Sequence, residues 1–153
     1  DSYFLINKER DIILRLKGST KYGQGYAGQK GLPFYDKFRT GGPKSVRGYK
    51  KNSLSPLDSR GNSLGGDFAV TGSAEVIFKP PLDIKSLRTA FFADFGRAFK
   101  DYDSFEFGDL KGSAGLSVKY LSPFGGISIN ISTPLNSEAE DKTESFQFNL
   151  GTN

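Results

Sequence analysis

Apolar residues recur at every second position along much of this chain, and this period constrains the fold more than any other feature. In residues 68–78 the even positions are apolar or glycine, whereas the odd positions are mostly small or polar. Period two is that of a β-strand, whose successive side chains point to opposite faces. No comparable stretch has helical spacing, so the sequence predicts an all-β protein. The same alternation recurs in five further segments: 12–22, 87–99 (less cleanly), 113–120, 127–132 and 146–151.

The connections between these segments alternate between short and long. An up-and-down barrel that crosses an outer membrane has this arrangement, with tight turns at one end and long polar loops at the other. Several segments also approach the length of about 9–11 residues that a tilted strand needs to cross the hydrocarbon core. The pattern therefore indicates an antiparallel up-and-down transmembrane β-barrel. The short connections are 7–11, 79–86 and 121–126, and the long ones are 23–66, 100–110 and 133–145.

A soluble lipocalin-like barrel or a β-sandwich alternates in the same way, with its apolar face turned inward. Three features favour the membrane barrel. Basic residues on the polar faces suit a wet lumen: Arg15, Lys17, Lys21 and Lys119. Small residues are common within the strands: Gly18, Gly72, Gly112 and Gly115. Aromatic residues near strand ends resemble interfacial girdles: Tyr22, Phe68, Phe78, Phe99, Tyr120 and Phe146.

The composition excludes several classes of function. The chain has no cysteine and no histidine, which removes disulfides, Cys/His zinc sites, thiol nucleophiles and Ser-His-Asp triads. We therefore expect no metal, no cofactor and no catalytic residue. The net charge is +4, but the basic residues are scattered, so no nucleic-acid partner is expected. The longest apolar runs are four residues, far below the roughly 20 of a membrane-spanning helix.

The number of predicted strands raises a pairing problem. About six strands cannot close a barrel, since the smallest have about eight. In lipid an open sheet edge leaves backbone N–H and C=O groups without partners. The opening residues 1–6 already read as part of a strand. We therefore expect residues 1–153 to form the end of a longer barrel domain, or to pair their edges with something else.

The connection 23–66 is too long to be a simple linker. Near its middle, Gly41, Gly42 and Pro43 impose a tight turn, and Gly48 allows the backbone to approach a wall closely. Arg47 lies just beyond that turn, and its planar guanidinium can clamp carboxylates.

Two carboxylates on the next strands are candidate partners for Arg47. Glu75 and Asp94 occupy polar faces at otherwise small, uncharged positions. An acid inside a barrel is costly unless it is paired. The sequence thus predicts that loop 23–66 folds back into the lumen and that Arg47 docks on both acids. On these grounds alone a solvated Arg47, with the acids facing lumen water, remains an alternative.

The run 41–49 (Gly-Gly-Pro-Lys-Ser-Val-Arg-Gly-Tyr) resembles the loop motif of outer-membrane assembly factors of the BamA type, in which GG is followed by VRGF or VRGY. The similarity covers essentially the whole chain in order and spacing. It also includes 32–35, 74–78, 91–96, 113–115, 121–125 and 146–151. The motif residues are Gly41, Gly42, Val46, Arg47, Gly48 and Tyr49.

The resemblance implies that these are the last six or so of sixteen strands, and that earlier strands and periplasmic POTRA domains are absent from this sequence. It also implies that the family's loop arginine and its two lumen acids correspond to Arg47, Glu75 and Asp94. Two departures are visible: loop 23–66 lacks the cysteine pair of some members, and the chain stops one residue short of the family's usual C-terminal aromatic. The implied last strand, at a gate that opens sideways, carries Phe146, Phe148, Asn149 and Gly151.

The function that the resemblance implies is the insertion and folding of β-barrel proteins in the bacterial outer membrane, as the core barrel of the assembly machinery. The implied partners are nascent outer-membrane proteins, lipoprotein subunits of the assembly complex and the lipid bilayer. No bond is made or broken, so no enzyme activity is expected. Two alternatives stay open: a TamA-like factor or two-partner-secretion translocator, and a soluble β-barrel that binds a small apolar ligand.

Overall fold

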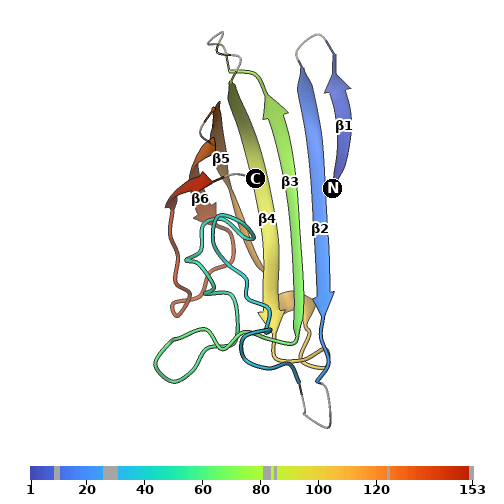
Figure 1. The fold of residues 1–153 in the computed structure, drawn as a ribbon, viewed down its shortest axis with the longest axis vertical. Coiled ribbons are helices and arrows are strands. Elements are labelled where there is room, and N and C mark those ends of the chain that lie inside the picture. Colours follow the sequence, from blue (N-terminus) through green and yellow to red (C-terminus); the bar gives the residue numbers. More distant parts are fainter. Residues whose placement is uncertain (9–10, 26–30, 81–83, 85, 124, 152–153) are drawn as a thin grey trace.

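Seven antiparallel strands form one sheet in the computed structural model of the chain, and each strand pairs with the next in sequence (Figure 1). The structure describes residues 1–8, 11–25, 31–80, 84, 86–123 and 125–151. The predicted all-β, up-and-down class is therefore confirmed. The strands number seven because the opening segment forms a strand of its own against its successor. They are β1 (Ser2–Asn7), β2 (Ile12–Tyr22), β3 (Phe68–Phe78), β4 (Leu87–Phe99), β5 (Lys111–Ser122), β6 (Gly125–Pro134) and β7 (Phe146–Gly151).

Helical structure in the described residues amounts to one short 3-10 turn, η1 (Phe107–Asp109), between β4 and β5. None of the helical structure described here is long and apolar enough to cross a bilayer.

The alternation along β4 separates an apolar face from a polar one. Phe91 and Phe95 are 59% and 48% exposed, whereas Phe92 and Asp94 between them are 4% and 3% exposed. The register keeps this separation from β2 to β7, because each of these neighbouring pairs is in register without a bulge. The apolar face is the one that a transmembrane barrel turns to lipid. The opposite face is the lumen wall, on which the candidate site is built.

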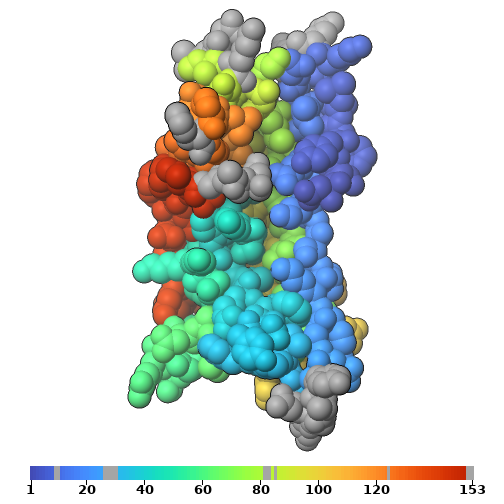
Figure 2. All heavy atoms as spheres, viewed as in Figure 1, coloured from blue at the N-terminus to red at the C-terminus, as the bar shows by residue number. Residues whose placement is uncertain are grey.

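The long connections lie at one end of the sheet and the β1–β2, β3–β4 and β5–β6 turns at the other (Figure 1). The connection between β2 and β3 starts at the long-loop end and runs back along one face of the sheet. In Figure 2 its residues, coloured cyan, fill that face between β2 in blue and β7 in red. The sheet thus wraps around part of this loop.

Two of the aromatic residues predicted for an interfacial girdle are buried instead. Phe68 and Phe99 are 6% and 4% exposed, and the ring of Phe105 lies 5.5 Å and 5.2 Å from theirs, centroid to centroid. The connection between β4 and β5 therefore folds over the outer face at the long-loop end. The alternation of apolar and polar residues along a strand cannot predict this burial, because the covering residue belongs to a loop. Tyr22, Tyr120 and Phe146 do remain exposed.

Gly115 lies where β5 and β6 approach each other closely. A Cβ atom there would come 2.2 Å from the carbonyl oxygen of Ile131 and 2.7 Å from Cα of Ser132, both backbone atoms. We expect Gly115→Ala to destabilise the pairing by about 1–3 kcal/mol, the usual range for overpacking. The measurement is the temperature at which the folded band of the full-length protein disappears on a semi-native gel.

Gly18→Ala is the matched control, because nothing described lies within 4 Å of a Cβ added at that position. A transition temperature that is the same in Gly115→Ala as in the parent would contradict the prediction.

Candidate functional site

The tight turn before Arg47 is closed by local hydrogen bonds. The amide of Gly42 donates to the carbonyl of Val46 at 3.0 Å, and the amide of Gly41 donates to the Ser45 hydroxyl at 2.9 Å. Gly41 and Gly42 adopt φ angles of 101° and 100°, in the left-handed region that disfavours side chains. A Cβ on Gly41 would also lie 2.7 Å from the carbonyl oxygen of Lys50. The two glycines are therefore required by the turn itself.

A small apolar cluster anchors the loop beside this turn. Val46 and Tyr49 are fully buried, and Leu54 is 3% exposed. The Tyr49 hydroxyl donates a hydrogen bond to the carbonyl of Gly112 on β5 at 3.1 Å. Both the apolar contacts and this bond fix the backbone that carries Arg47.

Arg47 binds both carboxylate oxygens of Asp94 on β4. Its Nε lies 2.6 Å from Oδ2 and its Nη2 lies 2.7 Å from Oδ1, a bidentate geometry. The backbone amide of Arg47 also donates to Oδ2, at 3.1 Å. Ser73 on β3 donates to Oδ1 at 2.6 Å. Asp94 is thus held by four donors on the loop and the adjacent strand.

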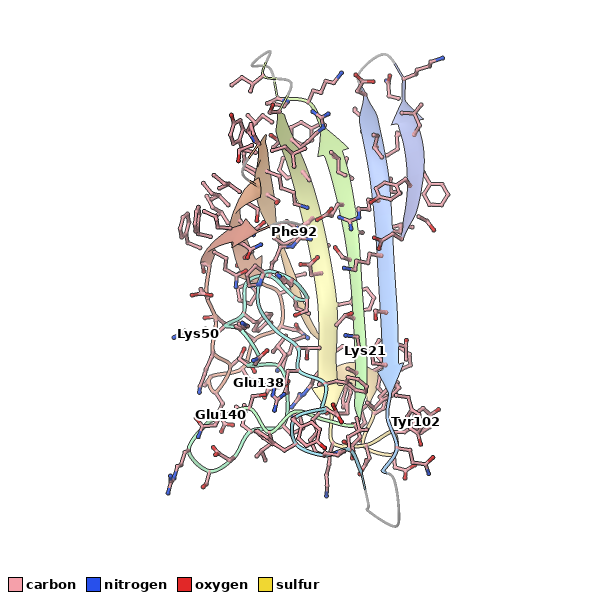
Figure 3. The ribbon with its side chains drawn as sticks, in the orientation of Figure 1. Lys21, Lys50, Phe92, Tyr102, Glu138 and Glu140 are labelled. Atoms are coloured by element: carbon pink, nitrogen blue, oxygen red, sulfur yellow. The ribbon has the colours of Figure 1, made fainter. Side chains whose placement is uncertain are left out.

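The same guanidinium reaches Glu75 on β3. Nη1 lies 2.6 Å from Glu75 Oε1, and Cζ lies 3.6 Å from the ring centroid of Phe92, which is labelled in Figure 3. Stacking on an aromatic face adds a cation–π attraction to the two ion pairs. Arg47, Glu75 and Asp94 are 6%, 4% and 3% exposed. The loop arginine and the two acids that the sequence singled out therefore meet in one buried cluster.

Glu75 has two further cations beside it. Arg15 Nη1 on β2 lies 3.2 Å from its Oε2, and Lys119 Nζ on β5 lies 3.8 Å from its Oε1. Three positive charges thus surround one carboxylate, whereas Asp94 faces Arg47 alone among the described ion pairs. Burial of charge is tolerable here because each carboxylate has a partner in place.

A cavity of about 380 Å³ adjoins this cluster, and Arg47 and Glu75 form part of its wall. Most of the side chains that line it are polar or charged, as expected for a wet lumen. Within the described ranges, no group of three or more acidic, cysteine or histidine residues could hold a metal ion. The charged residues that line the cavity are Arg15, Lys17, Lys44, Arg47, Glu75 and Lys119.

Gln147 on β7 contacts the motif, and the sequence analysis did not single it out. Its Nε2 donates to the Tyr49 carbonyl at 2.7 Å, and its Oε1 accepts from the Gly48 amide at 3.3 Å. Gly48 has φ 86°, and a Cβ there would lie 3.1 Å from the Ser132 hydroxyl. The only sequence signal was the position of Gln147 on the polar face of its strand, which gives no partner.

The residues predicted for the last strand fall into two groups. Phe146 and Phe148 point to the outer face, 59% and 55% exposed, and Asn149 lies on the lumen face as part of the cavity wall. Gly151 pairs with Gly126 of β6. Among the described strands β7 pairs with β6. The predicted polar terminus, 152–153, lies outside the described residues.

The fold and this site together define a class of protein, the transmembrane β-barrel with a loop bound inside its wall. The chain belongs to the Omp85 superfamily, whose domain model matches residues 1–153. Together with relatives named outer membrane protein assembly factor BamA, this places the chain in the bacterial outer membrane.

Individual relatives agree with this assignment. The chain is 34% identical to the outer membrane protein assembly factor BamA of Neisseria meningitidis, over 94% of this chain and 22% of that protein. It is 33% identical to BamA of Nitratidesulfovibrio vulgaris, over 81% of this chain and 16% of that protein. The chain thus spans about a fifth of the length of these relatives.

A solved structure shows the same fold. The crystal structure of BamA from Haemophilus ducreyi lacking POTRA domains 1–3 matches with a TM-score of 0.80 and 28% identity, over 95% of this chain and 32% of that one. The resemblance to assembly factors of the BamA type is therefore confirmed.

The geometry of Arg47 makes the docked loop sensitive even to Arg47→Lys. A lysine ammonium cannot bind Asp94 bidentately and reach Glu75 at the same time. We expect the loop to leave its position more often, which exposes Val46. The measurement is labelling of Val46→Cys by a membrane-impermeant maleimide, because Val46 is fully buried and this chain has no cysteine.

Lys50→Cys is the control, since Lys50 is exposed and should label equally with Arg47 or with lysine at position 47. Equal protection of Val46→Cys in both backgrounds would show that the ion pairs do not hold the loop.

Proposed function

We propose that this chain is the C-terminal barrel portion of a factor that inserts and folds β-barrel proteins in the bacterial outer membrane. The observation that supports it is the loop motif docked through Arg47 on Glu75 and Asp94, in an Omp85 chain similar to two proteins named BamA. In this proposal, upstream strands and periplasmic POTRA domains belong to the same longer protein.

The physical task of such a factor is to supply backbone partners. A nascent strand cannot enter lipid with free N–H and C=O groups, each of which costs several kcal/mol. A strand edge can accept it by β-augmentation. We propose that this happens at the edge of β7 that faces away from β6, on the strand that carries Phe146, Phe148, Asn149 and Gly151.

The proposed partners follow from the two faces and the edge of the sheet. The apolar outer face meets the lipid bilayer, and the edge of β7 meets nascent outer-membrane proteins. Lipoprotein subunits of the assembly complex are partners by analogy with the relatives' role. The step is pairing rather than covalent chemistry, so we propose no enzyme activity, in line with relatives that are named assembly factors.

The second candidate function is a TamA-like factor or a two-partner-secretion translocator, which shares the Arg-Gly-Tyr loop. The relatives' names favour the BamA type. The number and type of periplasmic domains encoded upstream would separate the two. Membership of the Omp85 superfamily and the exposed apolar outer face disfavour a soluble ligand-binding barrel.

The proposal is tested with the full-length protein carrying Arg47→Ala. Removing one partner of a buried ion pair costs about 3–5 kcal/mol. The equilibrium constant for docking of the loop should therefore fall by well over tenfold. We expect the variant to fail to support growth of a strain depleted of its own assembly factor. In liposomes it should fold a client barrel at least about tenfold more slowly than the parent.

Arg39→Ala is the matched control. Arg39 lies on the same loop, but its guanidinium binds the backbone carbonyls of Lys37 and Phe34 rather than the acids. Full growth with Arg47→Ala at the parent's protein level would refute the role of the loop. A parent protein that neither supports growth nor folds a client would refute the proposed function itself.

A further inference from the structure

The loop motif is paired with the segment that leads into the last strand. The Glu144 amide donates to the Gly48 carbonyl at 2.9 Å, and the Lys50 amide donates to the Lys142 carbonyl at 2.8 Å. Tyr49 and Thr143 form an antiparallel bridge between them. Lys50, labelled in Figure 3, thus ends a short strand-like stretch of the loop.

Gln147 continues this pairing with its side chain. Its carboxamide accepts from the Gly48 amide and donates to the Tyr49 carbonyl, so it takes the place that a peptide group of a neighbouring strand would take. The side chain is 3% exposed, and its Nε2 also lies 3.2 Å from Glu144 Oε2. A carboxamide is suited to this position because it offers both N–H donors and a carbonyl acceptor, as a peptide group does.

The motif is therefore tied to two separate parts of the sheet. Arg47 binds β3 and β4, and the next two residues bind Gln147 on β7. Gln147 is itself paired with Asn130 of β6. The Ser132 amide donates to the Ser145 carbonyl at 2.9 Å, which closes the start of the β6–β7 pair. To leave the lumen, the loop must therefore break its bonds to β3 and β4 and also its bonds to β7.

We propose that Gln147 is a positioning residue that couples the docked loop to the last strand. With the loop docked, Gln147 holds the start of β7 against β6, and the edge available to a client begins beyond it. When Arg47 releases the acids, the start of β7 loosens and the usable edge lengthens. This inference rests on the proposed function for its biological meaning, but the coupling itself is a property of the fold.

The test is hydrogen–deuterium exchange of the full-length protein in lipid nanodiscs, in a double-mutant cycle of Arg47→Lys and Gln147→Ala. Each single variant should speed exchange in peptides covering 127–133 and 142–149 by about three- to tenfold, the effect of losing one or two net hydrogen bonds. In the Gln147→Ala background, Arg47→Lys should add little, because the link is already broken.

Asn136→Ala is the matched control. Its carboxamide also binds two backbone groups, the Gly112 amide at 2.6 Å and the Leu110 carbonyl at 2.7 Å, but it does not contact the motif or β7. It should leave exchange at 127–133 unchanged. Gln147→Glu, which keeps the acceptor and loses the donor, replaces Gln147→Ala if that variant does not give the folded band.

Two results would overturn the coupling. One is unchanged exchange at 127–133 in both Gln147 variants, and the other is an additive effect of Arg47→Lys and Gln147→Ala. A cycle that shows coupling in a protein that folds no client would leave the inference standing and refute the proposed function. The two failures are therefore distinguishable.

Discussion

A carboxylate buried in a barrel wall requires a positive partner, and the arrangement of this chain follows from that requirement. Asp94 and Glu75 lie on neighbouring strands and face the lumen at 3% and 4% exposure. The cation that binds both comes from a loop 28 residues from Glu75 and 47 residues from Asp94 in the chain, so the charges fix a long-range contact that strand pairing cannot. The glycine turn at 41–42, the buried Val46 and the Tyr49 anchor all bring the guanidinium to that point.

The strand bounds and the buried charge cluster could largely be predicted from the sequence. The bounds of β2, β3, β4 and β7 match the predicted segments, because the period-two pattern runs to the ends of those strands. The charge argument proposed Arg47 as the partner of Glu75 and Asp94 but left a solvated arginine open, and the family resemblance favoured the docked loop. Family resemblance supplied the function, which pairing and charge do not encode.

The features that the sequence did not predict depend on how loops pack against the sheet. Phe68 and Phe99 were predicted to lie in an interfacial girdle because they are near strand ends, and only the structure shows Phe105 covering them. Gln147 was missed for a similar reason: a polar residue on a lumen face has no stated partner until the loop is in place. Periodicity reports the face of a side chain, whereas these contacts depend on tertiary arrangement.

The unequal surroundings of the two acids have a consequence for the undocked state. If the loop withdraws, Glu75 keeps Arg15 and Lys119 as counter-ions, while Asp94 retains the hydroxyl of Ser73. The free-energy penalty of withdrawal therefore falls mainly on one aspartate. Among the charges that hold the loop, Asp94 therefore opposes withdrawal most strongly, because the partner that it keeps is a neutral hydroxyl.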